Sequence, residues 1–302
     1  MKVLLVGLGK ASWLYAEEDF SKWPITHTHA LNYINGVYLA GGCDTNFEIA
    51  IAWGNRFCLP VYESIDEIEL QVDLVVIAVN HENLLSCLLK SLKKWPLAKI
   101  LIEKPLVTKV EDIKILTDLN CQEKDRVWIN FPRLFQTETH KIKEILKRYQ
   151  QNNNFDSLRV TGSYTGGYLN TASHLISLLD FLFGELKFTQ ITSHNTPDIS
   201  FDFRNGSVSG RIHGKEKGTS TFDLDIVGSG LCITYKNGGS KIIVNDFKEG
   251  IYELPASRSD YQVEVYKSLL LQFNFAEKHV STLQSQMYAM TQLVTMQQEL
   301  EM

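Results

Sequence analysis

Residues 3–12 read VLLVGLGKAS, and this stretch decides the fold class. Its apolar first part predicts a short buried strand that runs directly into a glycine. Gly7, Gly9 and Ser12 then form the pattern G-x-G-x-x-S, where the dinucleotide-binding fingerprint has G-x-G-x-x-G or A. The first glycine allows a tight turn, the second lets backbone amides approach a pyrophosphate, and Ser12 is small enough for close helix packing. Alone the match is weak, because short glycine pairs are common in loops.

Strand and helix patterns alternate through the rest of the first half. Further predicted strands lie at residues 37–43, 61–62, 73–79, 100–102 and 126–131, with helices at about 84–94 and 111–119. This alternation predicts a parallel, doubly wound sheet, an α/β architecture. The loops after successive strands then converge on one edge of the sheet, where such sheets bind their ligands. The residues that fall on that edge are Gly7, Asp44, Asn80 and Lys104.

The predicted strand at residues 100–102 ends in Glu103, Lys104 and Pro105. Proline stops the strand, so the lysine is held at its carboxyl end. A lysine in that place is either a salt-bridged strand terminus or a group that takes part in chemistry. Glu103 either orients the lysine or closes a salt bridge away from the site, and we favour a structural role for it.

Asp44 follows the second predicted strand. An acid there can accept hydrogen bonds from both ribose hydroxyls of NAD and would repel the extra phosphate of NADP. Alternatively, Asp44 caps the helix that follows, and the two roles are compatible. We favour NAD over NADP. The stretch before this strand is longer than a minimal crossover and predicts an inserted loop at residues 23–29.

The second half of the chain follows a different pattern. Polar and apolar residues alternate at 159–164, 198–203, 207–212, 222–227 and 232–235. Asn205 and Gly206 give a strong hairpin signal between two of these segments. The pattern predicts a meander of antiparallel strands with one face solvated or used for association. Two closing helices are expected at residues 261–279 and 281–301.

A mostly apolar helix is predicted at residues 170–184, with Gly184 as its C-terminal cap. Asn170, His174 and Ser177 are spaced four and then three residues apart, so they share one face. A polar stripe on an otherwise buried helix needs partners or a cavity. Taken alone, His174 is more often a buried core histidine than a catalyst.

Composition excludes several classes of function. The 302 residues carry a formal net charge of −5, which gives no electrostatic argument for nucleic acid or for an anionic membrane. No apolar run is long enough to span a bilayer. The five cysteines are scattered without a C-x-x-C pair, so a disulfide framework or zinc site is not expected. A cytoplasmic location is expected instead.

Over essentially its whole length the chain resembles the glucose–fructose oxidoreductase / inositol dehydrogenase / MocA (Gfo/Idh/MocA) family. The carrying features are Gly7-Leu8-Gly9, Asp44, Glu103-Lys104-Pro105 and the helix that runs from Gly166-Gly167 through His174 to Gly184. The resemblance implies an N-terminal Rossmann domain, residues 1–122, and a C-terminal α+β domain with an open, mostly antiparallel sheet for substrate binding and oligomerisation, residues 123–302. It implies a homodimer or homotetramer formed through that sheet.

The resemblance also implies an NAD(P)-dependent oxidoreductase that interconverts a secondary alcohol and a ketone on a sugar, cyclitol or nucleotide-sugar-like substrate. It places Lys104 near the nicotinamide and the substrate hydroxyl, and makes His174 the acid/base. The chain departs from the family pattern at Asn170, where an aspartate is usual. It departs again at Ser177, Ser12 and Val79-Asn80. These changes leave open altered chemistry, on an imine, an enone or a dihydrodiol, or a catalytically silent cofactor-binding regulator.

The expected site is therefore large. Catalysis is assigned to Lys104, His174 and Asn170, and substrate binding to Arg133, Tyr164, Tyr168, Asn170 and His174. Cofactor binding is assigned to Gly7, Gly9, Lys10, Ala11, Ser12, Asp44, Val79, Asn80, His81, Glu103 and Lys104. Arg133 is as readily a surface ion pair, and a tyrosine in a strand usually serves packing. His27, His29 and His81 are expected in loops without a carboxylate at metal-ligand spacing, so no metal is predicted.

Overall fold

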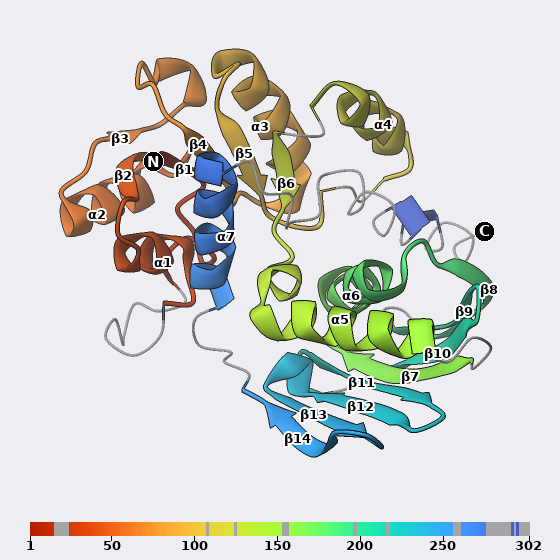
Figure 1. Cartoon of the computed structure of the whole chain (residues 1–302). Coiled ribbons are helices and arrows are strands. Elements are labelled where there is room, and N and C mark those ends of the chain that lie inside the picture. The colour runs from red at the N-terminus through yellow and green to blue at the C-terminus, as the bar shows by residue number, and fades with distance from the viewer. Residues whose placement is uncertain are drawn as a thin grey trace. The chain divides into compact units, whose positions relative to one another are not determined.

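The structure is a computed structural model. It describes residues 1–14, 24–106, 109–123, 126–152, 157–195, 198–215, 218–255 and 261–275, with the pairs 291–292 and 294–295. The chain divides into two compact units (Figure 1). The first comprises residues 1–132 together with the helix α7 (Tyr261–Phe275), and the second takes in the described residues from 133 to 255. The predicted helix at 281–301 lies almost wholly outside the described residues.

The first unit is a parallel sheet with connecting helices. Its strands are β1 (Lys2–Val6), β2 (Tyr38–Cys43), β3 (Val61–Tyr62), β4 (Leu74–Ile77), β5 (Lys99–Ile102) and β6 (Val127–Ile129). Its helices are α1 (His27–Tyr33), α2 (Phe47–Phe57), α3 (His81–Lys94), α4 (Glu111–Glu123) and α7. The strand order is β3-β2-β1-β4-β5-β6, with every described pairing parallel. The predicted doubly wound sheet is confirmed.

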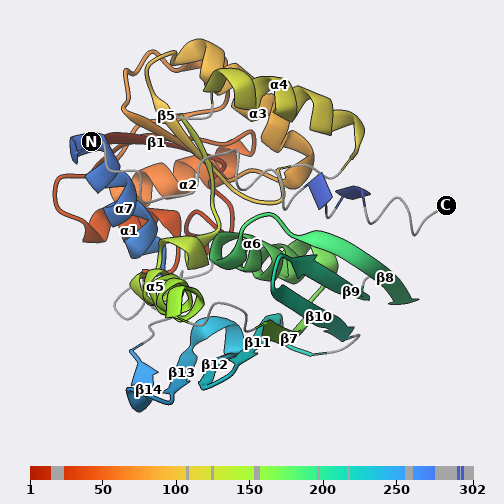
Figure 2. The same ribbon diagram turned by 45° about the vertical axis from the view of Figure 1, so that its right-hand side comes forward.

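Apolar runs form the centre of this sheet because its strands are covered on both faces. All four residues of β4 are buried, and Ile100, Leu101 and Ile102 of β5 have no exposed surface. Polar residues follow these strands, Asn80 after β4 and Glu103 and Lys104 after β5. The helix α7 follows the second unit along the chain but lies beside α1 in the first unit (Figures 1 and 2).

The second unit is an open sheet with helices on one face. It contains α5 (Thr137–Asn152), β7 (Leu158–Thr165), a π-helix at Tyr168–Ala172, α6 (Ser173–Phe183), β8 (Lys187–Asn195), β9 (Asp198–Asn205), β10 (Val208–Lys215), β11 (Thr221–Gly228), β12 (Leu231–Lys236), β13 (Lys241–Asp246) and β14 (Gly250–Leu254). The strand order is β14-β13-β12-β11-β7-β10-β9-β8. Among the described strand pairs of this second sheet, only β7–β10 is parallel. The expected mostly antiparallel sheet is confirmed.

Alternation along the strands separates the two faces of this sheet. Phe222, Leu224 and Ile226 of β11 are buried, whereas Asp223 and Asp225 between them are partly exposed. In Figures 1 and 2, α5 and α6 cover the sheet on one side only. The predicted hairpin is present, because Val208 pairs with Asn205 across Gly206. Self-association through the exposed face stays a prediction. No helix in the described part of the chain is long and apolar enough to span a membrane.

Candidate cofactor site and active-site residues

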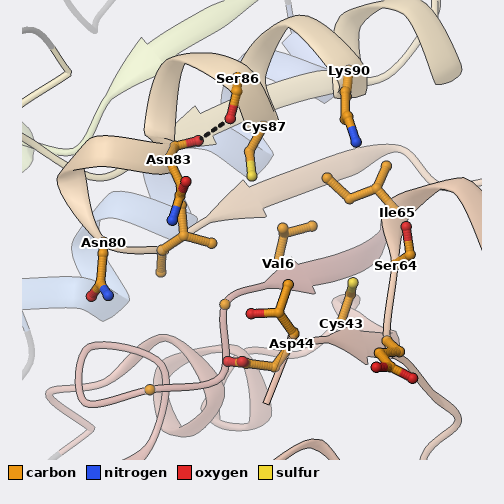
Figure 3. A pocket seen from close by; sticks show the side chains of 16 residues that line it. Val6, Cys43, Asp44, Ser64, Ile65, Asn80, Asn83, Ser86, Cys87 and Lys90 are labelled. Carbon is orange, nitrogen blue, oxygen red and sulfur yellow. Dashed lines mark hydrogen bonds between the residues drawn. The ribbon is translucent and has the colours of Figure 1, made fainter. Parts of the chain in front are cut away.

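A cavity of about 360 Å³ opens at the carboxyl ends of the parallel strands (Figure 3). Its size is within the range of small-molecule sites. The lining residues come from four strand ends and from α3: Val6, Gly7, Gly9, Cys43, Asp44, Thr45, Glu63, Ser64, Ile65, Ala78, Val79, Asn80, Asn83, Ser86, Cys87 and Lys90. Five predicted cofactor residues are thus brought together: Gly7, Gly9, Asp44, Val79 and Asn80.

The two fingerprint glycines serve different purposes. Gly7 has φ +89°, and a Cβ there would lie 2.5 Å from the carbonyl oxygen of Ala78. Only glycine therefore fits at this position, where the chain leaves β1 and passes close to the backbone that follows β4. A Cβ on Gly9 would meet nothing within 4 Å, so this glycine leaves open space at the edge of the cavity. That is the space into which a pyrophosphate would approach the backbone.

Ser12 closes the glycine turn in place of a third glycine. Its side chain is fully buried, and its hydroxyl donates a hydrogen bond to the Gly7 carbonyl. The same segment is bonded to the start of α1: the amides of His27 and Thr28 donate to the carbonyls of Ala11 and Ser12 at 3.1 and 2.9 Å. The predicted inserted loop at residues 23–29 is wrong in its second part, because α1 begins at His27. Residue 23 lies outside the described residues.

Asp44 is tied to the loop after β1. Its Oδ2 accepts a hydrogen bond from the Leu8 amide at 2.7 Å, and its Oδ1 accepts one from the Asn46 amide at 2.8 Å. The cap of α2 is Asn46, whose side chain accepts from the Ile49 amide at 3.3 Å. The capping role that the sequence left open for Asp44 therefore belongs to Asn46. Asp44 itself lines the cavity, and its carboxylate is held in place by the two amide hydrogen bonds.

Lys104 follows β5, the neighbour of β4 in the sheet. Burial lowers the pKa of Lys104, and the charge of Glu103 opposes that effect. Burial also raises the pKa of the Glu103 carboxyl, but hydrogen bonds from His27 and Asn130 and the charge of Lys104 bring it below its usual value. Oε1 of Glu103 contacts His27 Nε2 at 3.0 Å and Asn130 Nδ2 at 2.6 Å, and Oε2 accepts from the Lys104 amide at 3.3 Å.

Two histidines expected at a loop rim are buried in α1. His27 has no exposed surface and His29 is 9% exposed. The expectation was wrong because the segment 27–33 is helical and packs under the sheet edge, with Thr26 as its cap. His81 is exposed and, like Lys10 and Ala11, is not among the residues that line the cavity.

The second unit carries the predicted acid/base. His174 is half-buried on α6, Asn170 is exposed and Ser177 is buried. The predicted helix is wrong in its first turn, because residues 168–172 form a π-helix and the α-helix begins at Ser173. Such widened turns are frequent at functional sites. Gly184 caps the far end with φ +80°, as predicted.

The other predicted substrate residues are less accessible. Tyr164 is 1% exposed, and its hydroxyl donates to the Ile199 carbonyl at 2.7 Å and accepts from the Ile199 amide at 2.8 Å. Tyr168 is 4% exposed, and burial raises its pKa well above the usual value. Both observations favour the packing role that the sequence left open. Arg133 is half-buried in the short helix Pro132–Phe135.

Comparison with known proteins assigns the first unit. Residues 1–131 match the family model described as an oxidoreductase family with an NAD-binding Rossmann fold, Gfo/Idh/MocA. The match covers the parallel-sheet unit of the chain. None of the curated proteins compared with the sequence matches it.

Solved structures share the fold over nearly the whole length of the chain. An oxidoreductase from Agrobacterium radiobacter, in complex with NAD⁺, L-tartaric acid and magnesium, is 15% identical, with 98% of this chain and 94% of that chain covered and a TM-score of 0.74. An oxidoreductase from Thermotoga maritima is 16% identical, with 97% and 94% covered and a TM-score of 0.77. A mutant 3-ketoreductase from Actinomadura kijaniata, in complex with TDP-benzene and NADP, is 12% identical, with 97% and 95% covered and a TM-score of 0.72.

Sequence reasoning missed one wall of the cavity in the first unit. Asn83, Cys87 and Lys90 point from α3 toward the cavity, and Asp44 lies on its opposite side (Figure 3). The signal was present, because positions 83, 86, 87 and 90 recur at helical spacing and share one face. Glu63, Ser64 and Ile65 after β3 carried no comparable pattern.

Proposed function

We propose that the chain is an NAD(P)-dependent oxidoreductase that interconverts a secondary alcohol and a ketone on a sugar, cyclitol or nucleotide-sugar-like compound. The observation that carries the proposal is the cavity at the strand ends, with Gly9 and Asp44 on its wall and Lys104 at the end of the adjacent strand. The family of the first unit supports the cofactor class. A relative in complex with TDP-benzene and NADP supports a nucleotide-sugar-like substrate.

The residues present fit a nicotinamide dinucleotide. Gly9 leaves open space beside the backbone, and Asp44 keeps acceptor capacity beyond its two amide partners, since a carboxylate has about four lone-pair sites. We assign the pyrophosphate to the turn at Gly7 and Gly9, and the adenosine ribose to Asp44. When bound, the cofactor supplies the acceptor or donor of hydride. The protein has to orient the substrate and manage one proton.

Lys104 is assigned to the substrate oxygen. Alcohol oxidation passes through a developing alkoxide, which a fixed cation stabilises most strongly in a partly desolvated place. Glu103 offsets the effect of burial on Lys104 and so favours the ammonium form. His174 is assigned the proton, which it accepts in oxidation and donates in reduction, since its ordinary pKa suits both roles near neutral pH. Asn170 is assigned a hydrogen bond to substrate or to His174.

Turnover is tested with a panel of sugars, cyclitols and nucleotide sugars, each offered with oxidised and reduced cofactor. We expect at least one compound to change the nicotinamide absorbance. NADH binding without any turnover would instead favour the cofactor-binding regulator, for which the loss of the usual aspartate at Asn170 argues. Turnover of an imine, enone or dihydrodiol alone would favour altered chemistry.

Asp44→Asn tests the preference for NAD. The carboxylate gives charge-assisted hydrogen bonds to ribose hydroxyls, so its loss is expected to weaken NADH binding by about tenfold or more. NADPH binding should weaken less or improve, because the charge that repels its extra phosphate is gone. Binding is measured by nicotinamide fluorescence titration.

Glu63→Gln is the matched control, since it removes another acid from the same cavity. Glu63→Gln is expected to change the affinities for NADH and NADPH little. If Asp44→Asn weakens NADH and NADPH equally, Asp44 braces the loop through Leu8 and does not select the cofactor.

Asn170→Asp tests the departure from the family pattern. A negative charge four residues before His174 favours the imidazolium and raises the pKa of His174, by roughly half a unit or more for an exposed group. Oxidation needs neutral His174, so the acid limb of its kcat/KM profile should move to higher pH. Reduction needs protonated His174, so its alkaline limb should also move to higher pH. The neutral Asn170→Ser variant is the control; coincident profiles for Asn170→Asp and wild type would show that charge here is unimportant.

A further inference from the structure

A buried polar network lies behind Lys104 and gathers side chains from distant parts of the chain. Glu103 stands at its centre, with His27 of α1 at 3.0 Å and Asn130 after β6 at 2.6 Å. His27 Nδ1 in turn contacts the hydroxyl of Tyr266 on α7 at 2.6 Å, and Asn130 Nδ2 contacts Gln262 Oε1 on the same helix at 3.3 Å. All these atoms belong to the first unit.

The chemistry of the network fixes the direction of its hydrogen bonds. An ionised carboxylate only accepts, so His27 donates to Glu103 from Nε2. The other ring nitrogen, Nδ1, is hydrogen-bonded to the Tyr266 hydroxyl. His27 and Tyr266 have no exposed surface, so bulk water does not replace either contact. The result is a continuous hydrogen-bonded path from Tyr266 through His27 to Glu103.

We propose that His27 is a positioning residue for Lys104 and acts through the carboxylate of Glu103. His27 and Asn130 hold Oε1, while Oε2 accepts from the backbone amide of Lys104, so the carboxylate connects α1 to the residue at the end of β5. Tyr266 extends the same connection to α7. This inference deepens the proposed function and rests on it for the role of Lys104.

The charges in the network make the coupling measurable. The titratable groups that face Glu103 are His27, Lys104 and Tyr266. Burial opposes ionisation of Glu103, and the His27 hydrogen bond is the largest influence that favours it. Ionised Glu103 in turn favours the ammonium form of Lys104 against burial. Loss of the His27 donor should therefore lower the pKa of Lys104 and narrow the pH range in which it is a cation.

The test is the pKa of Lys104 in the cofactor-free protein, followed by NMR of ¹³C-dimethylated lysines, with the Lys104 signal assigned from Lys104→Arg. Two variants form a matched pair. The amide nitrogen in His27→Gln lies close to the place of Nε2 and keeps the donor to Glu103, whereas the shorter amide in His27→Asn does not reach it. We expect His27→Asn to lower the pKa of Lys104 by about half a unit or more, and His27→Gln to stay close to wild type.

Two controls separate coupling from loosening of α1. Glu103→Gln should give a larger fall in the same direction. His29→Asn, which changes another buried histidine of the same helix that contacts Thr26, should leave the Lys104 pKa unchanged. The proposal is overturned if His27→Asn leaves the pKa unchanged or raises it, if His27→Gln falls equally far, or if His29→Asn shifts it as much.

Should His27→Asn fail to fold, Tyr266→Phe decides, because it removes only the hydroxyl that is hydrogen-bonded to His27. It must lower the Lys104 pKa in the same direction, and no change would contradict the proposal. The measurement uses neither cofactor nor substrate. A panel without turnover would therefore refute the proposed function and leave this coupling intact. Turnover together with an unchanged Lys104 pKa in the variants would refute the coupling alone.

Discussion

Lys104→Met is expected to lower kcat by about 10²–10³-fold, the usual cost of removing one group that stabilises a developing oxyanion. Methionine keeps most of the volume of the lysine stem but brings no charge to the end of β5. NADH affinity should change only a few-fold, because the cavity is lined by other residues. The measurements are kcat on a substrate found with the panel and NADH affinity by fluorescence titration.

Lys99→Met is the matched control for this variant. Lys99 begins the same strand, burial lowers its pKa as it does for Lys104, and its ammonium lies over the Trp128 ring at 5.1 Å. It stands at the opposite end of β5 from the cavity edge, so kcat should stay close to wild type. Equal loss in both variants would indicate damage to the strand, and unchanged turnover in Lys104→Met would refute the assignment of Lys104.

His174→Gln is expected to lower kcat by about 10²–10⁴-fold, the usual contribution of a positioned general acid/base. Glutamine can keep a hydrogen bond to substrate but cannot exchange a proton near neutral pH. The loss should therefore appear in kcat, with KM changed much less. The limb of the pH–rate profile that reports His174 should disappear in the variant, which a purely structural role would not cause.

His140→Gln is the matched control in the second unit. His140 is also half-buried, and its Nε2 contacts the Leu134 carbonyl at 2.9 Å. Its loss is expected to affect stability but not the shape of the pH–rate profile. If His174→Gln retains wild-type turnover and profile, His174 has the structural role that is more frequent for a histidine in such a helix.

The parallel sheet was predictable because its strands are covered on both faces. Such strands are uninterrupted apolar runs, as in β4 and β5, and the polar residues that follow mark the strand ends. The hairpin at Asn205 and Gly206 was predictable because a two-residue turn has its own local chemistry. Both features depend on neighbours in sequence.

The features that were not predicted depend on contacts between residues far apart in sequence, or on whether a helical turn is α or π. His27 meets Glu103 and Tyr266 across 76 and 239 residues of sequence, so no local pattern marks it as buried. The return of α7 to the first unit has the same cause. At residues 168–172 the polar spacing suits an α-helix and a π-turn equally, so the sequence does not distinguish them. The fold and the strand-end residues could be predicted from the sequence, whereas the hydrogen-bond network around Glu103 and Lys104 could not.

A crystal structure with NADH tests the central claim most directly. We expect the adenosine ribose hydroxyls to donate hydrogen bonds to Asp44, the pyrophosphate to lie against the turn at Gly7 and Gly9, and the nicotinamide to lie beside Lys104. A dinucleotide bound away from the strand ends, or one whose nicotinamide lies out of reach of Lys104, would contradict the claim.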